Sequence, residues 1–320
     1  MADLKNTKME VFEVTYETFG NIICNPFHIY GNANYNHLKK HNCDSIHYLL
    51  FREGKYRLGI IGGIKGGAFL SLPTDSFGGF IYLQDNIKIS YIDNAIDLLV
   101  KWAKSKKLKA INLTLPPSIY DESFISKQMN SLFNNSFFIL KIELNHILPS
   151  AKFNDNYINE IGKYDRNNLN KALKNNLTFH QCENLLEKRI AYQIISLYKQ
   201  TQNEPLKISW KEILMTTTII DTEFFITYDN NNFPVAAAIV FHLSPSIVQI
   251  FNWGENPEFL HLRTMNYLAY KIFEYYHRDY QIIDLGPSSE NAVPNIDLCN
   301  FNESIGCDTT LKFSFIRSLT

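Results

Sequence analysis

Asp284 is the residue whose type and position best suit proton chemistry. It lies in a short apolar run, Ile282-Ile-Asp-Leu285, which Gly286 and a proline end, the pattern of a buried strand followed by a turn. Polar residues at strand ends of α/β sheets often face the ligand crevice, so this carboxylate could accept an amine proton or orient a substrate. The alternative is that it only accepts hydrogen bonds from backbone amides in the turn at Gly286.

Trp253 and a group of cations offer binding rather than proton chemistry. Trp253 could stack on a sugar or a base, although a tryptophan that fills a core or its rim is the more common case. Arg166, Lys171 and Lys174 lie in one predicted helical stretch, where Lys171 and Lys174 can share a face. They could hold the phosphates of a nucleotide-linked substrate or of tRNA, and the plainer interpretation is a solvated helix face.

Several other chemistries lack a complete set of residues. His37 and His41 could place two imidazoles on one helix face, but no third ligand completes a zinc site, and none does beside His180-Gln-Cys182. The glycine-rich stretch 59–67 lacks the Gly-Lys-Ser/Thr ending of a phosphate-binding loop, and its flanks are typical of paired strands. No Gly-x-Ser-x-Gly elbow occurs. The sequence therefore predicts no metal site and no serine hydrolase.

The hydrophobic pattern predicts that one series of elements positions these residues and that it occurs twice. In the first half we expect a helix near 26–41, then strands at 46–52, 56–64 and 68–72, a helix at 89–106, a strand at 109–114, a helix at 121–134 and a strand at 137–144. In the second half we expect strands at 223–228, 235–242 and 247–253, a helix at 262–277, a strand at 282–285, a helix at 296–305 and a strand at 309–316.

The constant spacing between the two series indicates an internal duplication. Matched elements are offset by roughly 172 to 176 residues, about one domain length. Ala110-Ile-Asn-Leu113 and Ile282-Ile-Asp-Leu285 also have similar sequences. The pattern predicts two copies of one α/β unit, in domains 1–150 and 151–320, with a largely helical segment at 151–220 between the matched elements.

The predicted unit resembles the Gcn5-related N-acetyltransferase (GNAT) fold, and two units in one chain resemble the FemAB-like group of peptidoglycan aminoacyltransferases. The stretches that carry the resemblance are 166–179, Phe251-Asn-Trp253-Gly254, Asp284-Leu-Gly286-Pro-Ser288 and 295–306, and in the first half 71–73, 76–79 and 117–120. The resemblance implies the α/β (α+β) class, with two tandem GNAT-like units, each a mixed, mainly antiparallel twisted sheet flanked by helices.

The resemblance also implies where the site lies. In the family a central strand splays from its neighbour, and amides at the start of the next helix receive the acyl donor's pyrophosphate. Here that helix is entered near 262–264, where Arg263 is the best candidate for meeting a phosphate or, alternatively, pairs with Glu258 on the surface. The implied residues are Asp284 and Ser288 for catalysis, Trp253, Gly254, Arg263, Thr264 and Asn302 for the donor, and Arg166, Lys171 and Tyr120 for the acceptor.

Two departures from the family pattern concern the donor. The loop before the helix, 257–264, has no glycine, whereas the family's acetyl-CoA pattern has a glycine-rich loop that lets backbone approach phosphates. Asn302 stands where FemAB enzymes usually have a lysine, so it can donate a hydrogen bond but supplies no charge. In the first unit, Asp75 and Asp85 on the donor-side loop predict a degenerate donor site that offers anionic phosphates little attraction.

The resemblance implies an N-acyltransferase that joins an acyl or aminoacyl group to an amine of a cell-envelope or polysaccharide precursor. It implies no tightly bound cofactor, acyl-CoA or aminoacyl-tRNA as co-substrate, and a small-molecule or nucleotide-linked acceptor, with tRNA as a further partner. The alternative is a non-catalytic binding module on a degenerate duplicated GNAT scaffold. The sequence leaves the oligomeric state open.

Composition agrees with an ordinary globular chain in a reducing compartment. The 320 residues carry a net charge of -1, which excludes a global attraction to nucleic acid or to acidic membranes. Five cysteines without a Cys-x-x-Cys pair argue against a disulfide framework. The longest apolar run, 235–241, is far shorter than the ~20 residues of a membrane helix, and the first twenty residues lack an apolar signal region. We therefore expect a cytoplasmic protein without membrane insertion.

Overall fold

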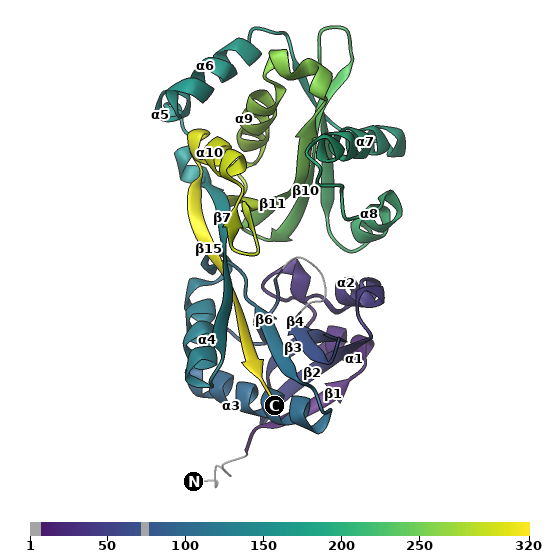
Figure 1. The fold of residues 1–320 in the computed structure, drawn as a ribbon, viewed down its shortest axis with the longest axis vertical. Helices are drawn as coiled ribbons and strands as arrows, with labels where there is room; N and C mark the ends of the chain where they lie inside the picture. The colour runs from purple at the N-terminus through teal and green to yellow at the C-terminus, as the bar shows by residue number, and fades with distance from the viewer. Residues whose placement is uncertain (1–7, 72–76) are drawn as a thin grey trace. The chain divides into compact units, whose positions relative to one another are not determined.

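The computed structural model describes residues 8–71 and 77–320, and the chain divides into two units. The first unit comprises Met1–Glu143 with Leu311–Thr320, and the second comprises Leu144–Thr310 (Figure 1). This differs from the expected boundary at residue 150, after which the whole chain would be in the second domain. The difference arises because the last strand, β15 (Asp308–Ser318), pairs antiparallel with β6 (Ala110–Thr114) of the first unit.

The sheet of the first unit has the order β1-β2-β3-β4-β6-β15. Its other strands are β1 (Glu10–Val14), β2 (Ser45–Glu53), β3 (Lys55–Lys65), β4 (Ala68–Ser71), β5 (Phe80–Tyr82) beside β3, and the start of β7 (Phe138–Pro149). Its helices are α1 (Tyr16–Ile22), α2 (Ala33–Leu38), α3 (Ile89–Ser105) and α4 (Glu122–Asn134), with 3₁₀ turns at Ile29–Gly31, Lys40–Asn42 and Ser118–Tyr120. The turns β2–β3 and β3–β4 use Gly54 and Gly66-Gly67, all at positive φ, which glycine adopts without strain.

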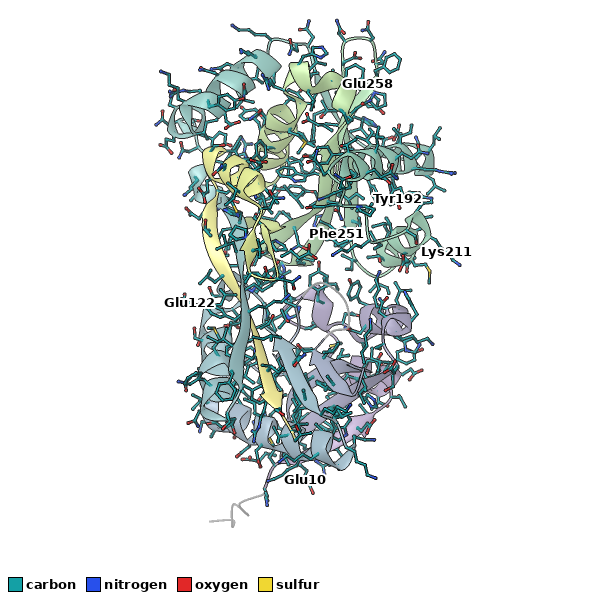
Figure 2. All side chains as sticks on the ribbon, viewed as in Figure 1. Glu10, Glu122, Tyr192, Lys211, Phe251 and Glu258 are labelled. Carbon is teal, nitrogen blue, oxygen red and sulfur yellow. The ribbon has the colours of Figure 1, made fainter. Side chains whose placement is uncertain are left out.

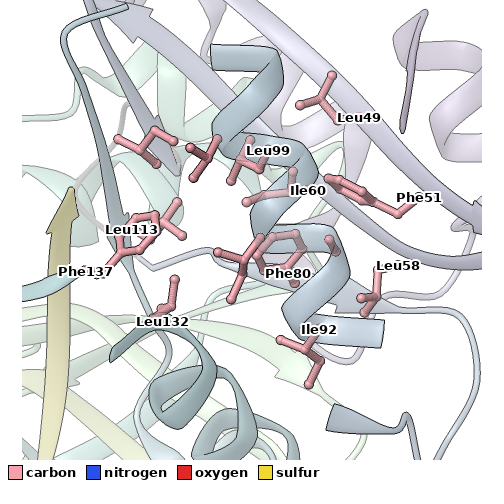
Figure 3. Close-up of a cluster of buried hydrophobic side chains, with 14 of the residues drawn as sticks. Leu49, Phe51, Leu58, Ile60, Phe80, Ile92, Leu99, Leu113, Leu132 and Phe137 are labelled. Carbon is pink, nitrogen blue, oxygen red and sulfur yellow. The ribbon is translucent and has the colours of Figure 1, made fainter. Parts of the chain in front are cut away.

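The core of the first unit packs α3 against the sheet, and Figure 3 shows this cluster around Leu99 and Ile92. The apolar stripe of α3 is buried from Ile92 to Ala103, whereas Ile89, the first residue of the helix, is 43% exposed. The single helix predicted near 26–41 is wrong. Asn32 accepts the N–H groups of Asn34 and Tyr35 and so starts a new helix, which divides the segment into short pieces. β1 and α1 were not predicted.

The sheet of the second unit has the order β7-β12-β11-β10-β9-β8. The strands are β8 (Thr178–Gln181), β9 (Thr222–Tyr228), β10 (Pro234–Ser244), β11 (Ile247–Glu255), β12 (Ile282–Pro287) and the end of β7, with a small hairpin of β13 (Ser289–Glu290) and β14 (Val293–Pro294). The helices are α5 (Tyr157–Glu160), α6 (Lys163–Ala172), α7 (Leu185–Thr201), α8 (Trp210–Thr217), α9 (Thr264–Tyr276) and α10 (Ile296–Ser304), with 3₁₀ turns at Ser150–Lys152 and Pro257–Leu262.

The two units are copies of one framework, which confirms the predicted fold class. In each copy an antiparallel meander leads to a central helix, α3 or α9, and then to a strand parallel to the meander's last strand: β4 with β6, and β11 with β12. The final strands are exchanged, because β15 pairs with β6 while β7 pairs with β12. Both follow equivalent helices, α4 and α10, so each can fill the same position in the ladder. Within the described residues, no helix has the length and apolar character needed to cross a membrane.

Candidate functional site

β11 and β12 separate in the middle of the second unit. They form a parallel ladder only between Ile247–Gln249 and Ile282–Asp284, although β11 continues to Glu255 against β10. Phe251, labelled in Figure 2, is the extra residue of a β-bulge, since its two neighbours Ile250 and Asn252 pair with consecutive residues of β10. A bulge bends its strand and increases the local twist. The splayed pair that the resemblance implies is therefore present, and α9 follows β11 after one loop.

The start of α9 already holds a carboxylate, that of Glu255. The Thr264 hydroxyl and the Met265 backbone N–H both donate to Glu255, beside Arg263 in the left-handed conformation (φ 59°). Burial raises the pKa of Glu255 above its ordinary value, although these hydrogen bonds and the Arg263 charge act in the opposite direction. Helix N-termini attract anions, and here the Glu255 carboxylate takes that place at the start of α9.

Asp284 is fully buried and accepts hydrogen bonds from at least three of the described residues. Its Oδ1 accepts from Asn145 Nδ2 at 2.8 Å and from the Gly286 backbone N–H at 2.9 Å. Its Oδ2 accepts from Gln249 Nε2 at 2.8 Å. The bond from Gly286 is the turn interaction that the sequence offered as the alternative role. These contacts join β7, β11 and β12 at the point where the parallel ladder between β11 and β12 ends.

Ser288 and Asn302 belong to a second buried group, whose centre is His146. Ser288 Oγ lies 2.8 Å from His146 Nδ1 and accepts from Asn302 Nδ2 at 3.0 Å. On its other side, His146 Nε2 lies 3.2 Å from Thr309 Oγ1 and 3.7 Å from a Glu303 carboxylate oxygen. Burial lowers the pKa of His146, although Glu303 acts to raise it. Ser288 and Asn302 are each only 1% exposed.

Trp253 and Gly254 lie near the end of β11 and have different environments. Trp253 is half-buried and meets Phe301 of α10 edge-on, with ring centroids 6.1 Å apart. Gly254 is buried, and a Cβ there would lie 2.7 Å from Tyr198 Cβ. The glycine thus lets α7 pack closely on β11, which is a structural requirement independent of any donor.

The predicted acceptor residues lie on separate elements. Arg166, on α6, donates from its guanidinium to the Asn159 backbone oxygen at 3.0 Å, whereas Lys171 on the same helix is exposed. Tyr120 lies in the first unit, within an aromatic group with Phe77 and with His28. The structure therefore brings Ser288 into contact with Asn302, and it places Arg263 and Thr264 together beside Glu255. Tyr120 lies in the other unit. Residues 72–76, which include Asp75 and Ser76 of the predicted motifs, lie outside the described residues.

Sequence reasoning missed Glu255 and His146. Glu255 is the last residue of the strand before the predicted donor helix, so its position along the chain was an available signal. No local signal points to His146, because it reaches Ser288 only through the exchange of β7. In the part of the chain that the structure describes, no three His, Cys, Asp or Glu side chains gather as metal ligands, and every cysteine is a free thiol.

Comparison with known proteins places this geometry in a class of folds. No family model and no curated protein matches the sequence. Among solved structures, FemX is similar at 12% identity over 96% of each chain, with a TM-score of 0.69. The C-terminal domain of a putative lysylphosphatidylglycerol synthetase from Agrobacterium fabrum is similar at 11% identity and TM-score 0.60 over 94% of this chain and 91% of that one.

A tandem GNAT protein from the clavulanic acid biosynthesis pathway is also similar, at 8% identity and TM-score 0.53 over 98% of this chain and 99% of that one. All three likenesses cover nearly the whole chain, from 94% to 98% of it. The protein therefore has a FemAB-like tandem GNAT fold, as the sequence resemblance implied. At these identities the comparisons establish the fold, and activity must be argued from the site.

Proposed function

We propose that this protein is an N-acyltransferase that transfers an aminoacyl group to an amine of a cell-envelope precursor. The observation that carries the proposal is the splay of β11 from β12 with α9 starting at its opening, within an end-to-end FemAB-like fold. In the reaction the amine nitrogen attacks the ester carbonyl carbon. The new C–N bond forms, the C–O bond to the donor breaks, and the donor hydroxyl leaves with a proton.

We propose aminoacyl-tRNA, rather than acyl-CoA, as the donor. Glu255 supports this, because its carboxylate accepts the hydrogen bonds that a pyrophosphate would otherwise take at α9. A phosphate charge placed about 4 Å from an ionised Glu255 would be repelled by about 4 kcal/mol at an effective dielectric constant of 20. The loop before α9 also lacks the glycines that let backbone approach a phosphate.

The burial of the candidate residues suggests how they divide the work. Trp253 and Arg263 are half-exposed and are proposed to contact the donor. Asp284 and Ser288 have almost no exposed surface, so we assign them positioning roles at the root of the splay. Arg166 and Lys171 of α6, and Tyr120 of the first unit, stay proposed acceptor contacts.

A donor panel tests the proposal. The protein is incubated with aminoacyl-tRNAs or acetyl-CoA together with amine acceptors, including nucleotide-linked envelope precursors, and products are followed by mass spectrometry. We expect an aminoacyl mass shift that requires tRNA and is reduced by Arg263→Ala but not by Arg189→Ala, an exposed arginine of α7. Transfer from acetyl-CoA would overturn the donor assignment, and no transfer from any donor would overturn the enzyme.

The burial of Asp284, Ser288 and Asn302 favours a second candidate, a binding module without catalysis. A ligand at a hundred times its dissociation constant adds about 2.7 kcal/mol to the free energy of unfolding. A thermal shift with an aminoacyl-tRNA, without any product, would select this second function over transfer.

A further inference from the structure

The first half of β7 carries a cluster of exposed apolar side chains. Phe138 and Leu140 are 67% and 50% exposed, and Ile139 and Ile142 are 47% and 39% exposed. Phe133 at the end of α4 adds a side chain that is 66% exposed. Leu311 of β15, the strand next to β7, is 40% exposed. Large contiguous apolar patches are rare on monomeric soluble proteins and mark interaction sites.

This part of β7 is also the edge of a sheet. β15 is its neighbour on one side, and on the other side β12 pairs only with residues 145–149. Among the described residues, no strand pairs with 138–142 on that side. Natural edge strands are normally protected by charge, proline or a bulge. The one cation here, Lys141, pairs with Glu143 at 3.1 Å, so its charge is locally compensated.

We propose that residues 138–142 pair antiparallel with the same residues of a second copy, forming a two-fold symmetric dimer. The segment is self-complementary, because antiparallel pairing centred on Leu140 places Leu140 opposite itself and Phe138 opposite Ile142. An interface between identical patches is the commonest way in which soluble chains associate. The unpaired backbone groups of the two edges satisfy each other in the same arrangement.

The exposed side chains of β7 set the size of this contact. Taking about 200 Å² for a whole large side chain, the four exposed fractions on β7 amount to about 400 Å² in each copy. Burying both sets removes at most about 800 Å² from solvent, which is in the range of weak, transient association. We therefore expect a dimer that dissociates in the micromolar range or above rather than a permanent one.

Sedimentation velocity tests the proposal on the whole chain between about 1 and 100 µM. We expect a monomer–dimer equilibrium in which Leu140→Lys raises the dissociation constant about tenfold or more, because two lysines then face each other across the axis. The matched control is Leu186→Lys, at a leucine of α7 that is 69% exposed, which should leave the equilibrium unchanged. A monomer at all concentrations, or a dimer insensitive to Leu140→Lys, overturns the proposal.

A cross-linking test examines the register without a destabilising charge. In a Cys24→Ser, Cys43→Ser background, Leu140→Cys should form a disulfide with its own copy, since directly opposed Cβ atoms lie about 5 Å apart. Ile142→Cys should not, because the two copies of residue 142 would be roughly 13 Å apart. Equal cross-linking of both variants, or none of Leu140→Cys, contradicts this pairing. This dimer does not depend on the proposed transferase activity.

Discussion

Asn112 of β6 and Asp284 of β12 occupy the same position in the two copies but have different surroundings. In the parallel ladders Leu70 faces Asn112, whereas Gln249 faces Asp284, and on the other side both face an isoleucine. Asn112 Oδ1 is buried and accepts no hydrogen bond from the described residues, while Asp284 accepts hydrogen bonds from at least three of them. The duplicated backbone thus supplies two equivalent positions, and neighbouring side chains decide which becomes a polar centre.

The starts of the two central helices show the same difference, with the polar contacts found in the second copy. α3 begins after Lys88, whose side chain makes no capping hydrogen bond, and its first turn has no acidic residue. α9 begins beside the Glu255 carboxylate, which accepts from Thr264 and Met265. Polar groups that suit a functional site are therefore concentrated in the second copy. The first copy keeps the framework without these groups.

The largest difference between the two copies is expected when each of the two equivalent polar residues is replaced by alanine. Asp284→Ala leaves three buried donors without their acceptor and should lower the free energy of unfolding by about 3 kcal/mol. Asn112→Ala removes an oxygen that already lacks a partner and should lower it by less than about 1 kcal/mol. Urea unfolding measures both. Equal losses in the free energy of unfolding would show that the two positions are energetically alike, which would contradict the difference between the copies.

Each copy contains a strand glycine that makes room for an aromatic residue, which allows a test of packing. A Cβ at Gly62 would lie 2.1 Å from the Phe69 ring, and one at Gly254 would lie 2.7 Å from Tyr198. Gly62→Ala and Gly254→Ala should each lower the free energy of unfolding by about 1–3 kcal/mol. The larger loss is expected at Gly62, because Phe69 is fully buried and Tyr198 is not. The opposite order in urea unfolding would assign the tighter packing to the second copy.

Glu255→Gln tests the difference between the helix starts. Burial raises the pKa of Glu255, so its ionisation destabilises the fold and stability falls as pH rises through that pKa. Glutamine keeps an acceptor for Thr264 but carries no charge, so this pH dependence should weaken and the free energy of unfolding at neutral pH should rise. Thermal unfolding between pH 5 and pH 8 measures it, with Lys88→Met of α3 as the control. If the pH dependence of stability is unchanged in Glu255→Gln, it does not arise from Glu255.

The smallest expected effect comes from glutamate–histidine pairs near the far ends of α3 and α9. In the second copy, burial acts to raise the pKa of Glu223, but bonds from His242 and Tyr276 lower it below 4.5. Burial acts to lower the pKa of His242, and the bond to Glu223 raises it above 6.5 on balance. The contribution of Glu223 is lost as pH falls below 4.5, and that of His242 is lost as pH rises through its raised pKa.

The pair should therefore stabilise the fold most between pH 4.5 and pH 6.5. His242→Gln should reduce the melting temperature most in this window and little at pH 9. Glu13 and His47 form a comparable pair in the first copy, 2.6 Å apart, and His47→Gln is the matched variant. A loss at His242 that is independent of pH would show that the side chain contributes by packing alone.

The sequence by itself determined the elements and their duplication. Hydrophobic periodicity is a local property, so the apolar stripe of α3, the glycine turns after β2 and β3, and the two parallel-strand motifs could be predicted from spacing. Local patterns failed where side-chain capping intervened, as at Asn32. Near the splay, Arg263 and Thr264 lie at the helix start that the pattern marks, whereas Asp284 lies within β12, which continues past the predicted end at Gly286.

Only the tertiary structure decided which strands became neighbours. The exchange of β7 and β15 brings His146 to Ser288 and Asn145 to Asp284, across more than a hundred residues of chain. Either strand offers a similar ladder, so nothing local distinguishes the exchanged pairing from the unexchanged one. The approach of Glu255 to Thr264 likewise depends on how the loop after β11 returns to α9. Pairing over such separations is set by the packing of the whole sheet, which no short stretch of sequence encodes.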